Sequence, residues 1–240
     1  MRQQRRDFAA RLLLEGLVIM LSILAAFALD RWSEGRRAAA EERQVLEGLR
    51  AEFTQARTEL EEYREIQRRT LNSVELVLRT VQEARAAGAA TAMVPDTALG
   101  LAYVAATAQP SLGTLSGLLA SARLGILRDP ELRRALAGWG GAFEDLAEEE
   151  ESSSLYVISQ LDPVMRARAD VSPFRNGSAL FDRTATAEQL AGTTAIPTDI
   201  EVIGVLAGRT MFLEHGIEEY VDVLANVDRI LARVEASLER

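Results

Sequence analysis

The longest hydrophobic stretch of the chain lies near its start. No charge occurs from Gly16 to Leu29, and Leu12 to Leu14 extend the apolar run backward across a single acidic residue, Glu15. The 18 residues from Leu12 to Leu29 would form an α-helix of about 27 Å, close to the roughly 30 Å of a bilayer's hydrocarbon core. The pattern therefore predicts one transmembrane helix over residues 12–32, preceded by a basic tail over residues 1–11.

The two ends of this segment suit the two surfaces of a bilayer. Glu15 lies within one helical turn of Arg11, at the headgroup end, and Trp32 lies at the other boundary, where indole rings concentrate. Ser22 and Ala26 are four residues apart and offer a face of small side chains for helix pairing in lipid. The residues predicted to form the anchor are Leu12, Glu15, Gly16, Ser22, Ala26, Leu29 and Trp32.

Two other interpretations of the segment stay open. A buried core helix would have a similar composition, although such helices rarely lack a polar face over this length. A cleaved secretory signal is the second, because four arginines precede the run and Ala26-Phe27-Ala28 fits the pattern of a cleavage site. An uncleaved helix is favoured, since no turn-forming residue occurs between the apolar run and Gly35.

Basic residues are balanced across the predicted span. Four arginines lie in the 11 residues before Leu12, and four more lie in the 18 residues from Asp30 to Glu47. Their density is higher on the N-terminal side, and the positive-inside rule places that side in the cytoplasm. We therefore expect a protein of the bacterial inner membrane with a cytoplasmic N-terminus and a periplasmic C-terminal domain.

Residues 33–87 have the pattern of one long stalk helix. Apolar residues recur at spacings of three and four, which is typical of a coiled coil and equally of a helix in a local bundle. Polar Gln67 and Thr70 interrupt the stripe and predict a polar layer in its middle. The stripe consists of Leu46, Leu49, Phe53, Ala56, Leu60, Tyr63, Val74, Val77, Val81 and Ala84.

Short helices rich in small residues are predicted for residues 88–129. After a break, Asp96 is expected to cap a helix that runs through Thr107, and Pro110 begins a second helix that Gly125 ends. Because small side chains allow backbones to approach closely, we expect the segment from 111 to 125 to contact a partner. The residues assigned to that contact are Ser111, Leu112, Gly113, Leu115, Gly117, Leu118 and Gly125.

Two further long helices are predicted for residues 130–240. Asp129 caps the first, with Pro130 in its first turn, and this helix runs to about Ala169 with a kink at its three glycines, Gly138, Gly140 and Gly141. Residues 172–197 form a polar loop with room for a short helix at 186–191. Thr198 caps the last helix, whose stripe consists of Ile203, Leu206, Thr210, Leu213, Ile217, Tyr220, Leu224, Val227, Leu231, Val234 and Leu238.

The fold class that follows is all-α. The N-terminal transmembrane helix continues into the stalk helix, and three long helices form an elongated antiparallel bundle with short helices attached. No later segment matches the first in length and purity, because Glu201 and Arg209 bracket the most apolar part of the last helix. The chain is therefore expected to cross a membrane once.

Composition narrows the chemistry. The 240 residues include no cysteine, and all 27 positive charges are arginine, which excludes thiol catalysis, thiolate metal sites, disulfides and lysine Schiff bases. The absence of lysine is typical of a GC-rich bacterial genome. A net charge of -9 argues against a nucleic-acid partner. No cofactor and no small-molecule substrate are indicated.

The remaining polar residues are each interpreted without a catalytic, metal-binding or modification role. His215, the single histidine, lies off the apolar stripe and is expected to face solvent rather than act as a base. Consecutive helical residues point in different directions, so Glu148–Glu151 are interpreted as a solvated face rather than a metal site. Ser152–Ser154 have no neighbouring base to activate them. Asn176-Gly177-Ser178 matches a glycosylation sequon and is interpreted as a turn.

Several parts of the chain resemble an uncharacterised family of bacterial single-pass membrane proteins. The resemblance rests on Glu15-Gly16-Leu17-Val18-Ile19, Ile23, Ala25, Asp30 and Trp32, and on the region from Pro110-Ser111-Leu112 to Leu132-Arg133-Arg134-Ala135-Leu136. Members share an N-terminal span that ends near a tryptophan and a helical domain beyond it. The resemblance covers about half of the chain, implies an uncleaved anchor, and carries over no activity.

The apolar stripes on three long helices must be covered, either within the chain or between chains. We therefore expect a non-enzymatic, membrane-anchored protein that acts as an interaction or assembly module, with membrane lipid and a protein partner or a second copy of the chain as its partners. An accessory subunit of a larger energy-transducing or transport complex is an alternative. A ligand-binding or sensory ectodomain is another, weakened by a cytoplasmic tail of only 11 residues.

Overall fold

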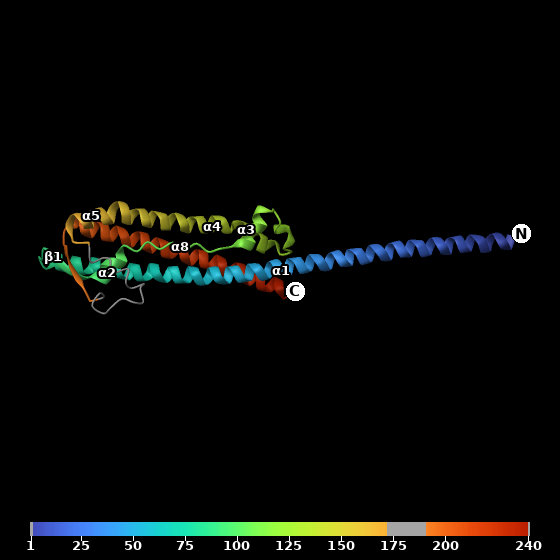
Figure 1. Ribbon diagram of the computed structural model, residues 1–240, viewed down its shortest axis with the longest axis horizontal. Helices are drawn as coiled ribbons and strands as arrows, with labels where there is room; N and C mark the ends of the chain where they lie inside the picture. Colours follow the sequence, from blue (N-terminus) through green and yellow to red (C-terminus); the bar gives the residue numbers. More distant parts are fainter. Residues whose placement is uncertain (1, 172–190, 240) are drawn as a thin grey trace.

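The structure is a computed structural model of the 240-residue chain. It describes the backbone of residues 2–171 and 191–239, and the side chains of residues 20–171 and 191–239. Three long helices pack side by side, and short helices and two short strands complete the fold (Figure 1). The expected helical bundle is thus confirmed. The predicted turn at 176–178, and all but the last residue of the predicted helix at 186–191, lie outside the described residues.

Helix α1 (Arg2–Ala86) is continuous over 85 residues, about 130 Å at the α-helical rise. One helix therefore runs from the apolar segment into the stalk, as the pattern predicted. Its second part packs in the bundle, whereas its first part extends alone beyond one end (Figure 1). Gly88, with a φ of +78°, ends the helix, and the amide of Ala89 donates to the carbonyl of Ala84 (2.9 Å), the bond expected at a left-handed helix terminus.

The bundle consists of α1, α4 (Pro130–Tyr156) and α8 (Ile200–Leu238). In Figure 1, α1 and α4 run in the same direction and α8 runs opposite to both. Only α8 is therefore antiparallel to its neighbours, which corrects part of the expected arrangement. We call the end from which α1 extends the proximal end, and the opposite end, where the strands lie, the distal end.

An extended segment connects the distal end with the proximal end. Because α1 and α4 are parallel, the chain must travel back along the bundle between them, and residues 104–112 do so without regular secondary structure. We call these residues the return segment. Helices predicted for 96–107 and 110–125 are wrong in extent, since α2 spans only Asp96–Ala102 and α3 only Gly113–Ala120.

Side chains from distant helices hold the return segment and the chain that follows it. The amide of Gln109 donates to Glu59 (3.1 Å), and the amide of Thr114 donates to Glu52 (2.6 Å). Gln67 donates its amide N–H to the carbonyl of Ala106 (3.4 Å). A backbone that lacks helical hydrogen bonds needs such partners when it is buried. Glutamates and a glutamine of α1 supply them.

Two short strands at the distal end were not predicted. β1 (Thr91–Pro95) and β2 (Thr193–Pro197) pair antiparallel, with Thr91 opposite Pro197 and Pro95 opposite Thr193. Both strands alternate exposed and buried residues. Sequence reasoning treated the two segments as a break and as part of a polar loop.

One helix cap agrees with the sequence prediction and another differs from it. Asp129 accepts hydrogen bonds from the amides of Glu131 (2.8 Å) and Leu132 (3.2 Å), which confirms it as the cap of α4. Asp199, not Thr198, caps α8. The hydroxyl of Thr198 instead donates to the carbonyl of Ala89 (2.6 Å) and ties the distal turn to α8.

Asp96 and Gly125 also occupy other positions than predicted. Asp96 lies inside the first turn of α2, after Pro95 as the capping residue, and accepts a hydrogen bond from the Thr194 hydroxyl (2.6 Å). Gly125 lies in a short 3-10 turn (Leu124–Ile126) rather than at the end of α3, which closes at Ser121.

α4 passes its three glycines as an unbroken α-helix. The irregularity comes later, in a π-helical turn (Val157–Leu161) that joins α4 to α5 (Asp162–Arg168). Pro163 explains its position, because a proline ring clashes with the carbonyl four residues earlier and a wider turn relieves that clash. The predicted kink at Gly138–Gly141 is therefore misplaced.

Two apolar clusters fill the bundle. The proximal cluster joins Leu46–Leu60 of α1 to α3, to the first half of α4 and to the second half of α8. The distal cluster joins Val74–Val81 to both strands, to α2 and to the first half of α8. Buried polar residues lie between the clusters: Gln67, Thr70, Glu150, Ser153 and Arg209. We call them the polar layer, and they include the two residues of α1 that predicted it.

Candidate functional site

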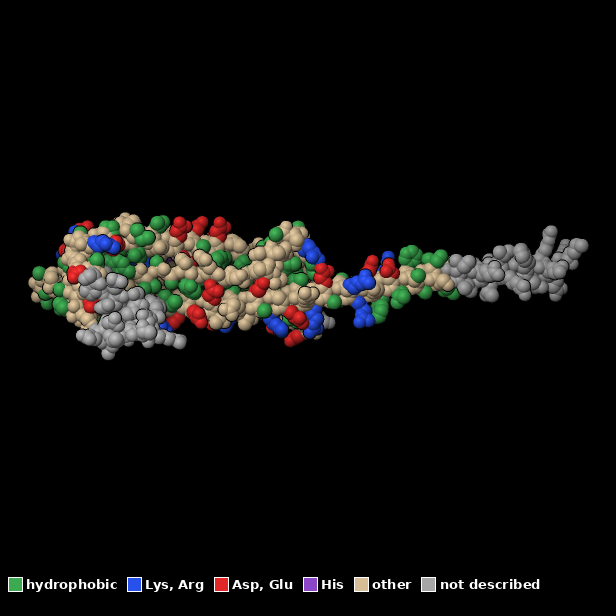
Figure 2. Space-filling model, viewed as in Figure 1, with side chains coloured by type: hydrophobic (Ala, Val, Ile, Leu, Met, Phe, Trp, Pro, Cys, Tyr) green, Lys and Arg blue, Asp and Glu red, His purple; other side chains and the backbone are tan. Residues whose placement is uncertain are grey.

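The first described part of α1 carries large apolar side chains that stay exposed. We call residues 20–38 the arm. Leu24 is 55% exposed, Phe27 64% and Trp32 59%, whereas leucines of the bundle core are almost wholly buried. Successive helical residues are rotated by about 100°, so the apolar residues of the arm point to every side of the helix. Figure 2 shows hydrophobic side chains around the described part of the projecting helix.

The predicted anchor residues fall partly within the described side chains. Ser22, Ala26, Leu29 and Trp32 are all exposed on the arm, whereas the side chains of Leu12, Glu15 and Gly16 lie outside the described residues. Among the helices of the described part, none combines the length and the apolar character needed to cross a bilayer. The predicted span therefore stays a prediction.

The end of the apolar part of the arm is marked by an aromatic and a cationic side chain. The guanidinium of Arg36 lies over the indole ring of Trp32, 4.8 Å from the ring centroid. The two residues are one helical turn apart, and this cation–π contact holds both side chains along the helix surface. Arg31 and Arg37, on either side of the pair, are exposed. Charged side chains thus follow the apolar side chains of the arm directly along the helix.

The segment predicted to contact a partner packs largely on its own chain. Leu112, Leu115 and Leu118 are buried in the proximal cluster, where they cover α1. Ser111, Gly113, Gly117 and Gly125 are exposed. Within the chain, the Thr114 side chain comes close to the backbone of α1 at Gly48, where an added Cβ would lie 2.9 Å from the Thr114 hydroxyl oxygen. Contact of the exposed residues with a partner stays a prediction.

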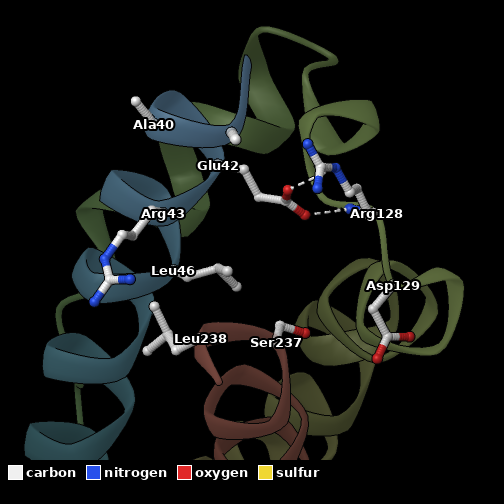
Figure 3. A pocket seen from close by; sticks show the side chains of 9 residues that line it. Ala40, Glu42, Arg43, Leu46, Arg128, Asp129, Ser237 and Leu238 are labelled. Atoms are coloured by element: carbon white, nitrogen blue, oxygen red, sulfur yellow. Dashed lines mark hydrogen bonds and ion pairs between the residues drawn. The ribbon is translucent and has the colours of Figure 1, made fainter. Parts of the chain in front are cut away.

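A pocket of about 380 Å³ lies at the proximal end, where α1 leaves the bundle. The side chain of Glu42 points toward Arg128, and its carboxylate accepts hydrogen bonds from the amide (2.6 Å) and the guanidinium (3.1 Å) of that residue (Figure 3). Leu46 and Leu238 form the apolar side. Glu42 and Arg128 are thus paired across the pocket, which joins α1 to the segment before α4.

Arg209 is a buried charged residue whose burial sequence reasoning did not foresee. It was interpreted as a charge that limits an apolar stretch, yet it is 0% exposed. Its guanidinium donates to the carbonyls of Ala102 (3.2 Å) and Val104 (2.6 Å), at the start of the return segment, and to Ser153 of α4. Burial lowers the pKa of Arg209 to about 10, so it stays charged at neutral pH.

Glu150 is a second buried ionisable residue, and it corrects the interpretation of Glu148–Glu151 as a solvated face at this one position. Glu148, Glu149 and Glu151 keep access to solvent. Its carboxylate accepts hydrogen bonds from the amide of Ala108 (3.1 Å) and from the hydroxyl of Tyr220. Desolvation raises the pKa of Glu150, and the two hydrogen bonds oppose that rise. Glu150 therefore joins three elements: α4, α8 and the return segment.

The periodicity of the stripes contained a signal for both residues. Val202, Leu206, Arg209, Leu213, Gly216 and Tyr220 alternate at spacings of four and three and are all buried. Glu150 follows Leu146 at a spacing of four, and Ser153 and Val157 continue the buried stripe of α4 and the turn after it. A charged residue in phase with such a stripe is buried with it.

The other chemical candidates lie where they were expected, with one exception. His215 is exposed on α8, which confirms the solvent-facing interpretation. Ser152 and Ser154 keep access to solvent, whereas Ser153 is buried against Arg209. In the described part of the chain, no three histidine, aspartate or glutamate side chains converge as a metal site requires.

Comparisons of this chain with known protein families, with curated proteins and with solved structures found no match.

Proposed function

We propose that this chain is a non-enzymatic, single-pass membrane-anchored protein whose helical bundle acts as an interaction or assembly module next to the bilayer. The exposure of the arm carries the proposal. Seven large apolar residues there are each more than half exposed: Met20, Leu21, Ile23, Leu24, Phe27, Leu29 and Trp32. Each Å² of apolar surface in water costs on the order of 25 cal/mol. Lipid around the helix removes that cost on every side at once.

The continuity of α1 supports a fixed position of the bundle above the membrane. Trp32 and Arg36 suit the headgroup region, where aromatic rings and cations concentrate. Among the described side chains of α1, Glu42 is the first that is buried in the bundle, and it lies ten residues and about 15 Å beyond Trp32 along the helix. In this proposal the tail lies in the cytoplasm of a bacterial cell and the bundle lies in the periplasm, close to the inner membrane.

The packing of the bundle favours a partner at the proximal end. Both apolar clusters are covered within the chain, so the fold needs no second chain to bury its stripes. The exposed residues of the small segment, Ser111, Gly113 and Gly117, lie on the end that faces the proposed bilayer. The partner that suits this position is another membrane protein or a second copy of this chain.

Membrane extraction tests the anchor. A triple variant, Leu21→Arg, Leu24→Arg and Phe27→Arg, would place three charges in the proposed hydrocarbon region, at a cost of about 2.5–3.5 kcal/mol each. We expect the native chain to stay in carbonate-washed membranes and the variant to move to the soluble fraction. The matched control replaces three exposed apolar residues of the bundle, Leu119→Arg, Ile158→Arg and Met211→Arg, and stays with the membranes. Native chain in the soluble fraction, cleaved or intact, contradicts the anchor.

Protease protection and crosslinking test the orientation and the module. Protease added to intact spheroplasts should digest the bundle, and digestion only after the cytoplasmic side is opened would reverse the proposed topology.

A photocrosslinking residue at Ser111 or Gly117 should give crosslinked species, whereas the same residue at His215, on the side of α8, should not. Products of uniform yield at all three positions would contradict a proximal contact surface.

A further inference from the structure

A groove of about 390 Å³ lies between α4 and the return segment. One wall is a single face of α4, with Phe143, Ala147, Glu150, Glu151 and Ser154 at helical spacing. The other wall is the extended backbone of Thr107, Ala108 and Gln109. The proposed function does not use this groove.

The charged group in this groove is almost wholly buried. Glu150 is 4% exposed, and because it lines the groove, its remaining accessible surface belongs there. Both of its hydrogen bonds, from the Ala108 amide and the Tyr220 hydroxyl, go to Oε1. No donor within the described residues contacts Oε2. One carboxylate oxygen, desolvated on most sides, is thus left for a group that enters the groove.

The residues that line the groove add negative potential and include no basic side chain. From Ala135 to Tyr156 the chain has six acidic residues and no basic residue, and Figure 2 shows acidic side chains gathered along α4. Glu151 lies in the groove wall, and no arginine is among the lining residues. A concave site with charges of one sign concentrates the opposite ion.

We propose that this groove binds a small organic cation, an alkylammonium or alkylguanidinium compound. Its charged group donates to Oε2 of Glu150, its hydrocarbon part lies against Ala147, and the ring of Phe143 offers both apolar contact and a cation–π surface. The mainly apolar walls favour an organic cation over a metal ion, which needs several oxygen ligands. The proposal does not depend on whether the arm lies in lipid.

A pair of probes with the same shape separates charge from hydrophobic contact. The full chain, in a non-ionic detergent, is titrated with n-butylguanidinium and with n-butylurea, its neutral analogue, while the amide resonances of Ala108, Ala147 and Ser154 are followed by NMR. We expect saturable shifts with butylguanidinium and an affinity about tenfold weaker for butylurea, as the loss of a charge-assisted hydrogen bond implies. Equal affinities, or no saturable shift with butylguanidinium, overturn the proposal.

Matched variants locate the binding. Glu150→Gln keeps an oxygen for Ala108 and Tyr220 while it removes the charge, and it should weaken butylguanidinium binding about tenfold. Glu148→Gln changes the net charge equally on an exposed turn of α4 outside the groove, and it should leave the affinity within about twofold. Ala147→Leu, which fills the groove and leaves Glu150 unchanged, should also abolish the saturable shifts. Native affinity in Glu150→Gln or Ala147→Leu overturns the proposal.

Discussion

The arm and the bundled part of α1 share one secondary structure and have opposite surroundings. In the arm, apolar side chains point to all sides and are exposed, as at Leu24 and Phe27. In the bundle they form one stripe, with Leu49 and Phe53 wholly buried, while the other faces carry ion pairs such as that of Arg57 with Asp228 (2.7 Å). The distribution of apolar residues around a helix, more than their number, thus indicates whether protein can cover it.

Truncating one phenylalanine in each region should give the largest difference in stability between the bundle and the arm. Phe53 packs edge-on against Trp139, with ring centroids 5.1 Å apart. Phe53→Ala should lower the free energy of unfolding by about 3–5 kcal/mol through lost burial and the cavity it leaves. Phe27→Ala should change it by less than about 0.5 kcal/mol. Urea unfolding of the full chain in a non-ionic detergent measures both, and similar losses would show that the arm packs on the bundle.

Removing one arginine from the bundle and one from the arm should have the next largest effect. Arg209→Ala leaves the carbonyls of Ala102 and Val104 without their donor and empties a buried volume, so a loss of about 3 kcal/mol is expected. Arg37→Ala, on the exposed arm, should be close to neutral. Hydrogen exchange should also show faster exchange in the return segment of the Arg209 variant only. A protected return segment in that variant would contradict the role given to Arg209.

Two glycines of α1 provide a smaller and sharper comparison. A Cβ on Gly48 would lie 2.9 Å from Oγ1 and 3.3 Å from Cγ2 of Thr114, whereas a Cβ on Gly35 meets nothing within 4 Å. Gly48→Ala should therefore destabilise the bundle by about 1 kcal/mol, since overpacking exceeds the gain in helix propensity. Thr114→Ala added to Gly48→Ala should recover that loss, and Gly35→Ala should leave the unfolding midpoint unchanged. Additive effects at positions 48 and 114 would rule out the close contact.

The smallest effect is a pH dependence from Glu150. Because burial raises its pKa above the ordinary value of 4.5, the folded chain binds this proton more tightly than the unfolded chain. The stabilisation by protonated Glu150 is complete below the ordinary pKa and is lost as pH rises through the raised pKa. Glu150→Gln removes this term, so its stability relative to the native chain should increase from pH 4 to pH 7. Glu34→Gln, on the arm, should show no such trend, and a constant difference for Glu150→Gln would contradict the prediction.

The stripes and the continuity of α1 could be predicted because both depend on local order in the sequence. Leu49, Leu206 and Leu213 are wholly buried at the positions that the periodicity assigned to them. The cap at Asp129 also follows from neighbours only, since its partners are two and three residues away. The lack of a polar face on the apolar part of the arm was likewise visible in the sequence.

The return segment and the strands could not be predicted, because their partners are distant. Residues 104–112 have a composition that helices tolerate, and what replaces their helical hydrogen bonds are side chains such as Glu59, 50 residues away. β1 and β2 are five residues each and pair across about 100 positions of sequence. No local pattern of five residues specifies such a pairing.

The polar layer was predicted on α1 alone. Gln67 and Thr70 interrupt an otherwise apolar stripe, which made the layer visible, whereas Arg209 and Glu150 were judged by charge instead of by phase. Their burial depends on carbonyls, an amide and two hydroxyls from α2, the return segment, α4 and α8, which come together only in the folded chain. The position of a buried charge can be predicted from its phase in the apolar stripe. Whether the fold tolerates the charge depends on the partners that hydrogen-bond to it.

Because a single helix joins the arm to the bundle, the two are locked in rotation as well as in distance. One residue inserted between Ala38 and Glu41 would turn the bundle by about 100° about the helix axis and raise it by about 1.5 Å. Seven inserted residues would restore nearly the same azimuth at a greater height. Any contact that depends on which side of the bundle faces a neighbour in the membrane is therefore set by the residue count of this short connection.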